Sequence, residues 1–252
     1  ALLGTLPQRP LTEKDHRLGL MAGCHVVQDR QYWMGGLSTS GGSIEWLRTQ
    51  LASEPLSYDD LLTLLETTDP QPTGILFFPY LLGSGSPHSD PLVRGAFVGL
   101  RQTHDRAELV KAVLEGTAYE MNFIRLAGEQ MTGQPIETFM VAGGGTRNRY
   151  WLQIKADISG CQILVSPETE STLLGAALSV GIGCGLYADD TEALATISNR
   201  SPEVINPDPE RHEIYQTLFN RGFLRLQEPL REFSNLDLFK EWSDASVYQF
   251  AA

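Results

Sequence analysis

The sequence is poor in basic residues. Lys and Arg together number 19 against 31 Asp and Glu, which leaves a formal net charge of -12. An electrostatic field of this sign repels a phosphate backbone, so the composition disfavours a nucleic-acid partner. A small anionic ligand remains compatible with it, because backbone N–H groups can bind phosphate without any cationic side chain.

Cysteine is also scarce. Cys24, Cys161 and Cys184 form no CxxC pair, so the sequence indicates neither a disulfide framework nor a structural zinc site. Such sparse use of cysteine is typical of a reducing compartment, and we expect a cytoplasmic protein. No apolar run approaches the ~18 residues of a membrane-spanning helix, which disfavours a membrane protein.

Two familiar glycine-rich nucleotide motifs are missing as well. A P-loop needs a Gly-Lys pair, and no such pair occurs in the chain. A dinucleotide fingerprint needs GxGxxG, and the stretch GGGTRN that starts at Gly143 lacks the last glycine. No HExxH motif or other metal-ligand spacing is present, so we assign no metal ligand.

Strands alternate with helices in the second half of the chain. This alternation predicts an α/β fold, a mixed sheet with helices on both faces. The helix expected over 170–185 is apolar almost all round, so we expect it to be buried, and we expect a polar break over 199–209. The strands are expected within 17–27, 31–38, 74–81, 94–100, 137–142 and 161–166, and the other helices within 38–52, 57–68, 105–131, 151–158 and 210–233.

The stretch FMVAGGGTRNRYW, residues 139–151, is the most informative one. An apolar strand stops at Gly143, Gly144 and Gly145, and the first turn of a helix follows. This order aims backbone N–H groups and the positive end of a helix at one point, where negative charge is favoured. Without Cβ atoms, a base or a ribose can lie against the backbone. On geometry alone, a nucleotide site and a purely structural tight turn remain equally open.

Several separate stretches, in their order and spacing, resemble the C-terminal domain of the FGGY carbohydrate kinases, which include xylulose kinase, gluconate kinase and glycerol kinase. They are FFPYLLGSGSPHSDPLVRGAFVGL, VLEGTAYEM and VAGGGTRNRYWLQIKADISGCQILVSPETESTLLGAA. The resemblance runs from about residue 17 to about residue 190. It implies the actin-like, RNase H-like ATPase fold, in which two domains face each other across a cleft. ATP would then lie mostly on the C-terminal domain and the sugar mostly on the N-terminal one.

The resemblance assigns the nucleotide-binding residues. Gly143, Gly144 and Gly145 match the turn that holds adenine and ribose. Asn148, one helical turn later, is placed for a hydrogen bond to the adenine.

Two further stretches match nucleotide-contacting segments of the family. In SGGSIEW, Gly41 would approach the phosphates, and Glu45 stands where glycerol kinase-like members have Gln. A glutamate only accepts hydrogen bonds, whereas Gln also donates, so a purine contact there would change. In LGTL, Thr5 matches the phosphate-binding hairpin.

The resemblance also implies a domain organisation. Residues 1–252 would be the C-terminal, nucleotide-binding domain of a two-domain sugar kinase, with 1–16 as a remnant of the interdomain segment and 234–252 as a tail. The chain starts without Met, so we expect it to begin within a longer protein. The catalytic base of the family is an aspartate in a GDQ-like motif. This chain has no such motif, so we assign it no catalytic residue and expect that base in an N-terminal kinase domain.

The implied activity is phosphotransfer from ATP, with Mg²⁺ bridging the phosphates, to a hydroxyl of a sugar or polyol. The stretches CHVV, SGGS and SPHSDP most resemble the xylulose kinase branch, which favours a ketopentose such as xylulose. Two alternatives stay open: a non-catalytic actin-like module that binds ATP for regulation or assembly, and a dinucleotide-dependent oxidoreductase built on VAGGGT. The sequence does not decide whether the chain forms a homodimer.

Two expectations concern packing. Asp157 falls on the polar side of its helix, so we expect it to be solvated and not to bind magnesium. The tryptophans, among them Trp33, Trp151 and Trp242, are expected in the core and not as stacking platforms for a ligand.

Overall fold

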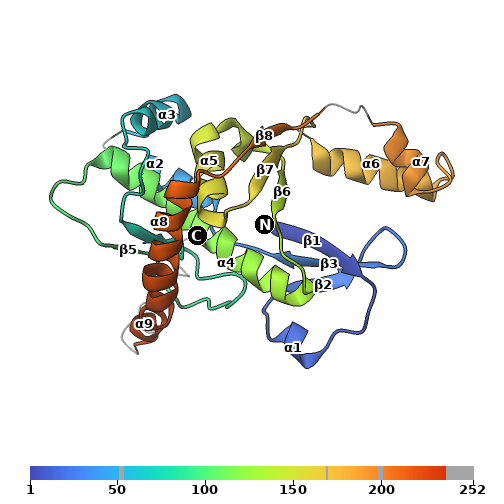
Figure 1. Ribbon diagram of the computed structural model, residues 1–252, viewed down its shortest axis with the longest axis horizontal. Helices are drawn as coiled ribbons and strands as arrows, with labels where there is room; N and C mark the ends of the chain where they lie inside the picture. Colours follow the sequence, from blue (N-terminus) through green and yellow to red (C-terminus); the bar gives the residue numbers. More distant parts are fainter. Residues whose placement is uncertain (51–53, 169, 198–200, 237–252) are drawn as a thin grey trace, which may run out of the picture.

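The computed structural model describes residues 1–50, 54–168, 170–197 and 201–236. Its strands form three sheets arranged around one long helix, α4 (Arg106–Thr132), as Figure 1 shows. Helix α4 contacts strands β1, β3 and β4 and helices α2, α3 and α5. Trp242, the tail beyond 236 and the end of the helix expected over 38–52 lie outside the described residues.

Local signals define α4. Both Ala107 and Glu108 donate their backbone N–H groups to the Asp105 carboxylate, and the Glu108 side chain accepts in return from the Asp105 N–H. This capping box satisfies N–H groups that no helical carbonyl can reach. The helix ends at Gly133, whose φ of 68° suits glycine. The helix expected over 105–131 is confirmed.

The N-terminal sheet is antiparallel, in the order β1-β3-β2. A sharp turn at Asp29, with φ of 59°, leads into β3. The short helix α1 lies between β1 and β2, and helices α2 and α3 follow the sheet. Residues 1–16, expected as a remnant of an interdomain segment, therefore contain a strand and a helix. The bounds are β1 Leu2–Pro7, α1 Glu13–His16, β2 Met21–Cys24, β3 Arg30–Gly35, α2 Gly41–Gln50 and α3 Tyr58–Glu66.

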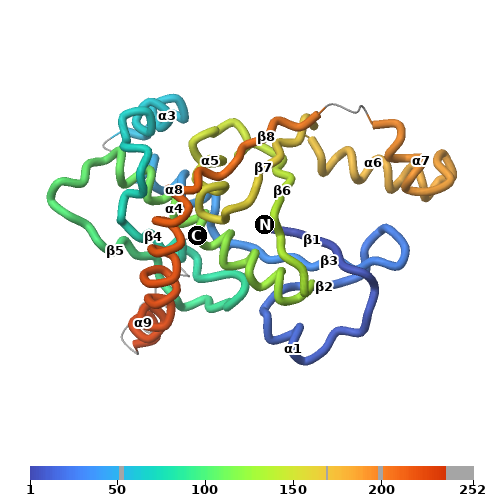
Figure 2. The backbone as a smooth tube through the Cα atoms, in the orientation of Figure 1, coloured from blue at the N-terminus to red at the C-terminus, as the bar shows by residue number. Residues whose placement is uncertain are grey.

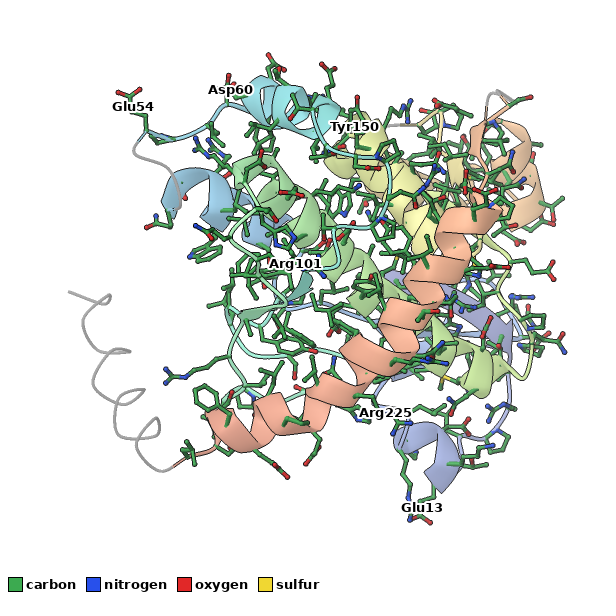
Figure 3. The ribbon with its side chains drawn as sticks, turned by 60° about the vertical axis from the view of Figure 1, so that its left-hand side comes forward. Glu13, Glu54, Asp60, Arg101, Tyr150 and Arg225 are labelled. Carbon is green, nitrogen blue, oxygen red and sulfur yellow. The ribbon has the colours of Figure 1, made fainter. Side chains whose placement is uncertain are left out.

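A two-stranded ribbon, β4 (Leu76–Phe78) with β5 (Ala96–Val98), packs on the other end of α4. The C-terminal segment covers it: helix α8 (Pro209–Leu218), a π-helical turn and helix α9 (Leu224–Ser234). Figure 3 shows this segment crossing α4. Phe78 stacks on Phe223 with ring centroids 4.8 Å apart, inside the largest buried cluster. The helix expected over 210–233 is confirmed.

The third sheet holds β6 (Thr138–Val141) parallel to β7 (Gln162–Val165), with α5 (Arg149–Ser159) as the crossover helix. Strand β8 (Glu203–Ile205) adds to β7 in the antiparallel direction. The sequence prediction missed β8, which falls in the expected polar break, because three residues give too little periodicity to detect.

Helices α6 (Ser171–Gly183) and α7 (Asp190–Ala195) pack on each other and extend away from the rest of the molecule, as Figure 2 shows. The expectation of a buried helix over 170–185 is wrong for this chain. Leu173 is 66% exposed and Val180 is 68% exposed. The sequence correctly gives an apolar helix, but nothing among the described residues covers it apart from α7.

Candidate functional site

The triple glycine makes a tight turn between β6 and α5. Gly143 has φ of 91°, a conformation that favours glycine. A 3-10 turn, Gly144–Arg147, follows it and is fixed by Thr146, whose backbone N–H and hydroxyl both donate to the Gly143 carbonyl, at 3.1 and 2.7 Å. The expected order of strand, glycine turn and helix is therefore present.

The three glycines differ in what surrounds them. A Cβ on Gly145 would lie 3.2 Å from the ring of Trp151, so packing within the chain accounts for that glycine. A Cβ on Gly144 would meet no described atom within 4 Å, and its φ is not positive. Neither strain nor packing explains why Gly144 lacks a side chain. Its exposed backbone is free to take a flat ligand at van der Waals distance.

Asn148 caps the helix that follows the turn. Its Oδ1 accepts a hydrogen bond from the Trp151 backbone N–H at 3.0 Å. The Nδ2 group makes no hydrogen bond to the part of the chain that the structure describes, so it is available as a donor. An amide at the N-terminus of α5 beside an open glycine backbone fits the predicted hydrogen bond to adenine, which remains a prediction.

A groove of about 1100 Å³ runs past this turn. Gly145 and Thr146 line it, and so do Ser40 and Gly41, at the start of α2. A Cβ on Gly41 would meet nothing within 4 Å either. The structure thus brings together two glycine segments that are about a hundred residues apart in the sequence.

Lys155 lines the same groove and was not among the predicted site residues. Its Nζ lies 3.7 Å from the centroid of the Trp151 ring. Loss of solvent lowers the pKa of the Lys155 ammonium to about 8. No carboxylate pairs with it among the described residues. In the sequence, the only indication was its position on the polar side of a predicted helix, and a side chain at such a position is usually exposed to solvent.

Glu45 does not line the groove. Both carboxylate oxygens accept hydrogen bonds from Arg48, at 2.6 and 2.7 Å, and this pairing lowers the pKa of Glu45. Tyr58 donates to the same carboxylate at 3.3 Å. The carboxylate is therefore already engaged on the helix surface, and its predicted contact with a purine stays untested.

Thr5 lines the groove, but it lies inside β1 and not in a hairpin turn. It stands opposite Tyr32, and its hydroxyl accepts a hydrogen bond from Arg30 at 2.6 Å. The preceding Gly4 leaves room for the Trp33 indole, which a Cβ would approach to 2.5 Å. Packing thus explains this glycine, and the predicted phosphate contact of Thr5 remains untested.

The expectation that Asp157 is solvated is wrong. It is buried, and its carboxylate accepts hydrogen bonds from Arg211 at 2.7 Å, from Gln153 at 2.8 Å and from the Asp208 N–H at 2.8 Å. These hydrogen bonds join α5 to α8, and they explain why Asp157 is buried.

Trp33 and Trp151 are buried, as expected. No cluster of three or more His, Cys, Asp or Glu able to hold a metal occurs within the described ranges.

The model of the FGGY family of carbohydrate kinases, C-terminal domain, matches residues 2–184. The chain belongs to this family. The resemblance drawn from the sequence is confirmed. This FGGY chain is 32% identical over 200 residues to a xylulose kinase of Staphylococcus epidermidis, which covers 78% of the chain and 39% of that protein. It is 30% identical over 194 residues to a gluconokinase of Bacillus subtilis, which covers 73% of the chain and 36% of that protein.

Solved structures agree with this family assignment. The xylulose kinase from Rhodospirillum rubrum matches 93% of this FGGY chain and 46% of its own chain, with a TM-score of 0.74 and 28% identity. The predicted α/β, actin-like fold is confirmed. The chain spans less than half the length of the curated relatives it matches. In the described part, no helix combines the length and the hydrophobicity that crossing a bilayer requires.

Proposed function

We propose that this chain is the nucleotide-binding half of an ATP-dependent carbohydrate kinase. The observation that carries the proposal is that two glycine segments, the turn at 143–145 and Gly41, border one groove. At Gly144 and Gly41 the chain leaves space that none of its own described atoms fills. Glycine backbone without a neighbour is expected where a nucleotide must approach closely.

ATP fits these residues. The turn at Gly143–Gly145 would hold the adenosine, with the Nδ2 of Asn148 as a donor to the base. The N-termini of α5 and α2 would face its phosphates, where backbone N–H groups favour negative charge. Lys155 adds a positive charge within the groove. With few carboxylates at the groove, we expect Mg²⁺ to be held by the phosphates and by water, with further ligands from outside this chain.

The role of this half is to bind ATP and to orient its phosphates. Bound ATP would supply the phosphoryl group, and fixed backbone donors would stabilise charge without reorganising. Closure against a second half would exclude water and limit hydrolysis of the nucleotide. The base that accepts the proton of the sugar hydroxyl has no candidate here, so we assign it to an N-terminal kinase domain. A cytoplasmic location suits a kinase that uses ATP.

A ketopentose such as xylulose is the proposed acceptor. The support is the resemblance to several proteins named xylulose kinase, among both curated relatives and solved structures. Relatives named gluconokinase and glycerol kinase make an aldonate and a polyol the necessary comparisons. A panel of pentuloses, aldonates and polyols is tested with the full-length protein and ATP. The acceptor is the compound in whose presence ADP is formed.

The decisive variant is Gly144→Val in the full-length protein. The new side chain would occupy the face where adenosine is expected, so ATP should bind at least ~10-fold more weakly by calorimetry, about 1.4 kcal/mol. Gly36→Val is the matched control, because a Cβ there also meets nothing within 4 Å and Gly36 does not line the groove.

Unchanged ATP affinity in Gly144→Val would contradict the assignment. Thermal-shift measurements with ATP and with NAD add a second discrimination, since a ligand raises the melting temperature by mass action. Stabilisation by NAD alone would favour the oxidoreductase reading. Binding of ATP without phosphorylation of any acceptor would favour the non-catalytic actin-like module.

A further inference from the structure

The glycine turn has few contacts with the rest of the molecule. Gly143, Gly144 and Gly145 are all exposed. Among the described residues, a Cβ on Gly143 or Gly144 would meet no atom within 4 Å beyond its chain neighbours. A Cβ on Gly145 would meet only the ring of Trp151. An exposed turn with so little packing moves easily unless a neighbour holds it, so its position depends on Trp151.

Helix α4 fixes the Trp151 ring in turn. The indole N–H donates a hydrogen bond to the Thr117 hydroxyl at 3.0 Å. That hydroxyl donates its own hydrogen to the Leu114 carbonyl at 2.8 Å, so its oxygen is available to accept from the indole. Trp151 and Thr117 are both buried, and an indole N–H without a partner would be costly there. The hydrogen bond therefore selects one orientation of the ring.

A second interaction holds the face of the same ring. The Nζ of Lys155, one helical turn after Trp151, lies 3.7 Å from the ring centroid. A cation over an indole face attracts it, most strongly where both are desolvated. Since α5 packs on α4, as Figure 1 shows, a rotation of the ring would weaken both this contact and the hydrogen bond to Thr117.

The backbone of Trp151 holds the other predicted nucleotide group. Its N–H donates to Oδ1 of Asn148 at 3.0 Å, and this bond fixes the direction of the amide. The side chain of Trp151 therefore supports the glycine turn, while its backbone orients Asn148. Both elements that we assign to the adenosine are connected to α4 through this one residue.

We propose that Trp151 is a positioning residue for the nucleotide. It keeps the turn at Gly143–Gly145 and the Asn148 amide at a fixed separation and orientation by tying both to Thr117 in the middle of α4. It acts through these groups and makes no contact with the ligand itself. Because the site is held in place before ATP arrives, less conformational freedom is lost on binding. This inference rests on the proposed function, since ATP is the ligand whose affinity Trp151 would set.

Thr117→Val in the full-length protein tests the anchor. The substitution keeps the shape of the side chain and removes the hydroxyl that accepts from the indole. The ring and the turn should then be held less tightly, so the Kd for ATP by calorimetry should rise at least ~3-fold. The KM for ATP should rise as well, and the KM for the sugar should not change. Thr117→Ser keeps the hydroxyl and should restore the affinity of the parent protein.

Thr73→Val is the matched control for a loss of stability alone. The Thr73 hydroxyl donates to the Glu115 carboxylate, so this variant also deletes a threonine hydrogen bond to α4. Thr73 does not line the groove. We expect a lower melting temperature in both valine variants, with the Kd for ATP unchanged in Thr73→Val.

The indole N–H gives a spectroscopic measure of the same coupling. Its NMR signal is identified in the full-length protein by its absence in Trp151→Phe. Addition of ATP should shift this signal in the parent protein, because the ligand lies against the turn that the ring supports. Trp151→Phe keeps an aromatic ring but cannot donate to Thr117, so its affinity for ATP should fall by about the same factor as that of Thr117→Val.

Unchanged ATP affinity in both Thr117→Val and Trp151→Phe would overturn the proposal. Equal losses of affinity in Thr117→Val and Thr73→Val would also overturn it, since they would trace the effect to stability. Gly144→Val, measured alongside, separates this inference from the nucleotide site. Weak ATP binding in Gly144→Val together with parent-like binding in the Thr117 and Trp151 variants refutes only the positioning role. Parent-like binding in Gly144→Val refutes the site, and with it the role of Trp151.

Discussion

At the scale of single residues, one buried carboxyl stands out. Glu120 lies within hydrogen-bond reach of the Tyr80 hydroxyl, which is also 2.6 Å from Oε1 of Gln227. A hydroxyl has one hydrogen, so Tyr80 cannot donate to two acceptors. Either of two changes resolves this: a protonated Glu120 that donates to Tyr80, or a rotated Gln227 amide, whose buried Nε2 otherwise has no partner among the described residues. Burial raises the pKa of Glu120 to about 7, which favours the protonated carboxyl.

This pKa predicts a pH-dependent stability. Because the folded value of about 7 lies above the unfolded value of 4.5, the folded state binds the proton more tightly. The stability that this provides is full below pH 4.5 and is lost as the pH rises through 7. Glu120→Gln keeps a donor without the charge, so it should be more stable than the parent protein by about 1–3 kcal/mol at pH 8.

Thermal melting at pH 5 and pH 8 measures the effect. The advantage of Glu120→Gln should appear at pH 8 and nearly vanish at pH 5. Glu137→Gln, at an exposed position, is the control and should follow the parent protein at both values. An advantage of equal size at both pH values would show that the gain has another origin.

At the scale of elements, the sequence predicted those whose signals are local. Helix α4 carries a capping box, a long apolar pattern and a terminal glycine, all within its own residues. Strand β8 carries no such pattern, since Val204 is 47% exposed and the strand exists because β7 offers an edge. The burial of Asp157 was equally hidden, because its partner Arg211 lies on another helix, 54 residues later.

The junction of α5 and α8 gives a prediction at this scale. Asp157→Asn removes the carboxylate that accepts from Arg211 at 2.7 Å and leaves Arg211 its longer ion pair with Asp208, at 3.3 Å, so we expect a loss of about 1–3 kcal/mol in unfolding free energy. Glu203→Gln is the matched control. It removes the ion pair with Arg149, whose side chain and that of Glu203 are half-exposed, and should cost less than ~1 kcal/mol.

Chemical denaturation with urea compares the two variants. Asp157 holds α8 against α5, so the urea midpoint of Asp157→Asn should be lower than that of the parent protein. The m-value should not change, because the surface exposed on unfolding stays the same. Similar, small losses in both variants would contradict the structural role of Asp157.

At the scale of the whole molecule, the α6–α7 arm is incomplete by itself. An apolar helix that is exposed along much of its surface is expected where another surface covers it. The exposed arm supports the proposal that this chain packs against a second half of a kinase.

Val180→Asp in the full-length protein tests this view. A charge in a covered apolar interface should lower the melting temperature by several degrees, since burying an unpaired charge costs a few kcal/mol, and should lower kinase activity. Thr191→Asp, at an exposed position on α7, adds the same charge and serves as the control. Identical melting of the two variants would show that Val180 remains exposed in the complete protein.

The sequence by itself determined the family, the α/β alternation, the main helices and the glycine turn between strand and helix. These depend on local chemistry: periodicity, caps, and glycine at a positive φ. Only the tertiary structure decided that Gly41 and Gly145 share a groove, that Asp157 is buried, that Lys155 lines the groove and that the apolar helix α6 is exposed. Each of these depends on contacts between residues far apart in the chain, which no local pattern encodes.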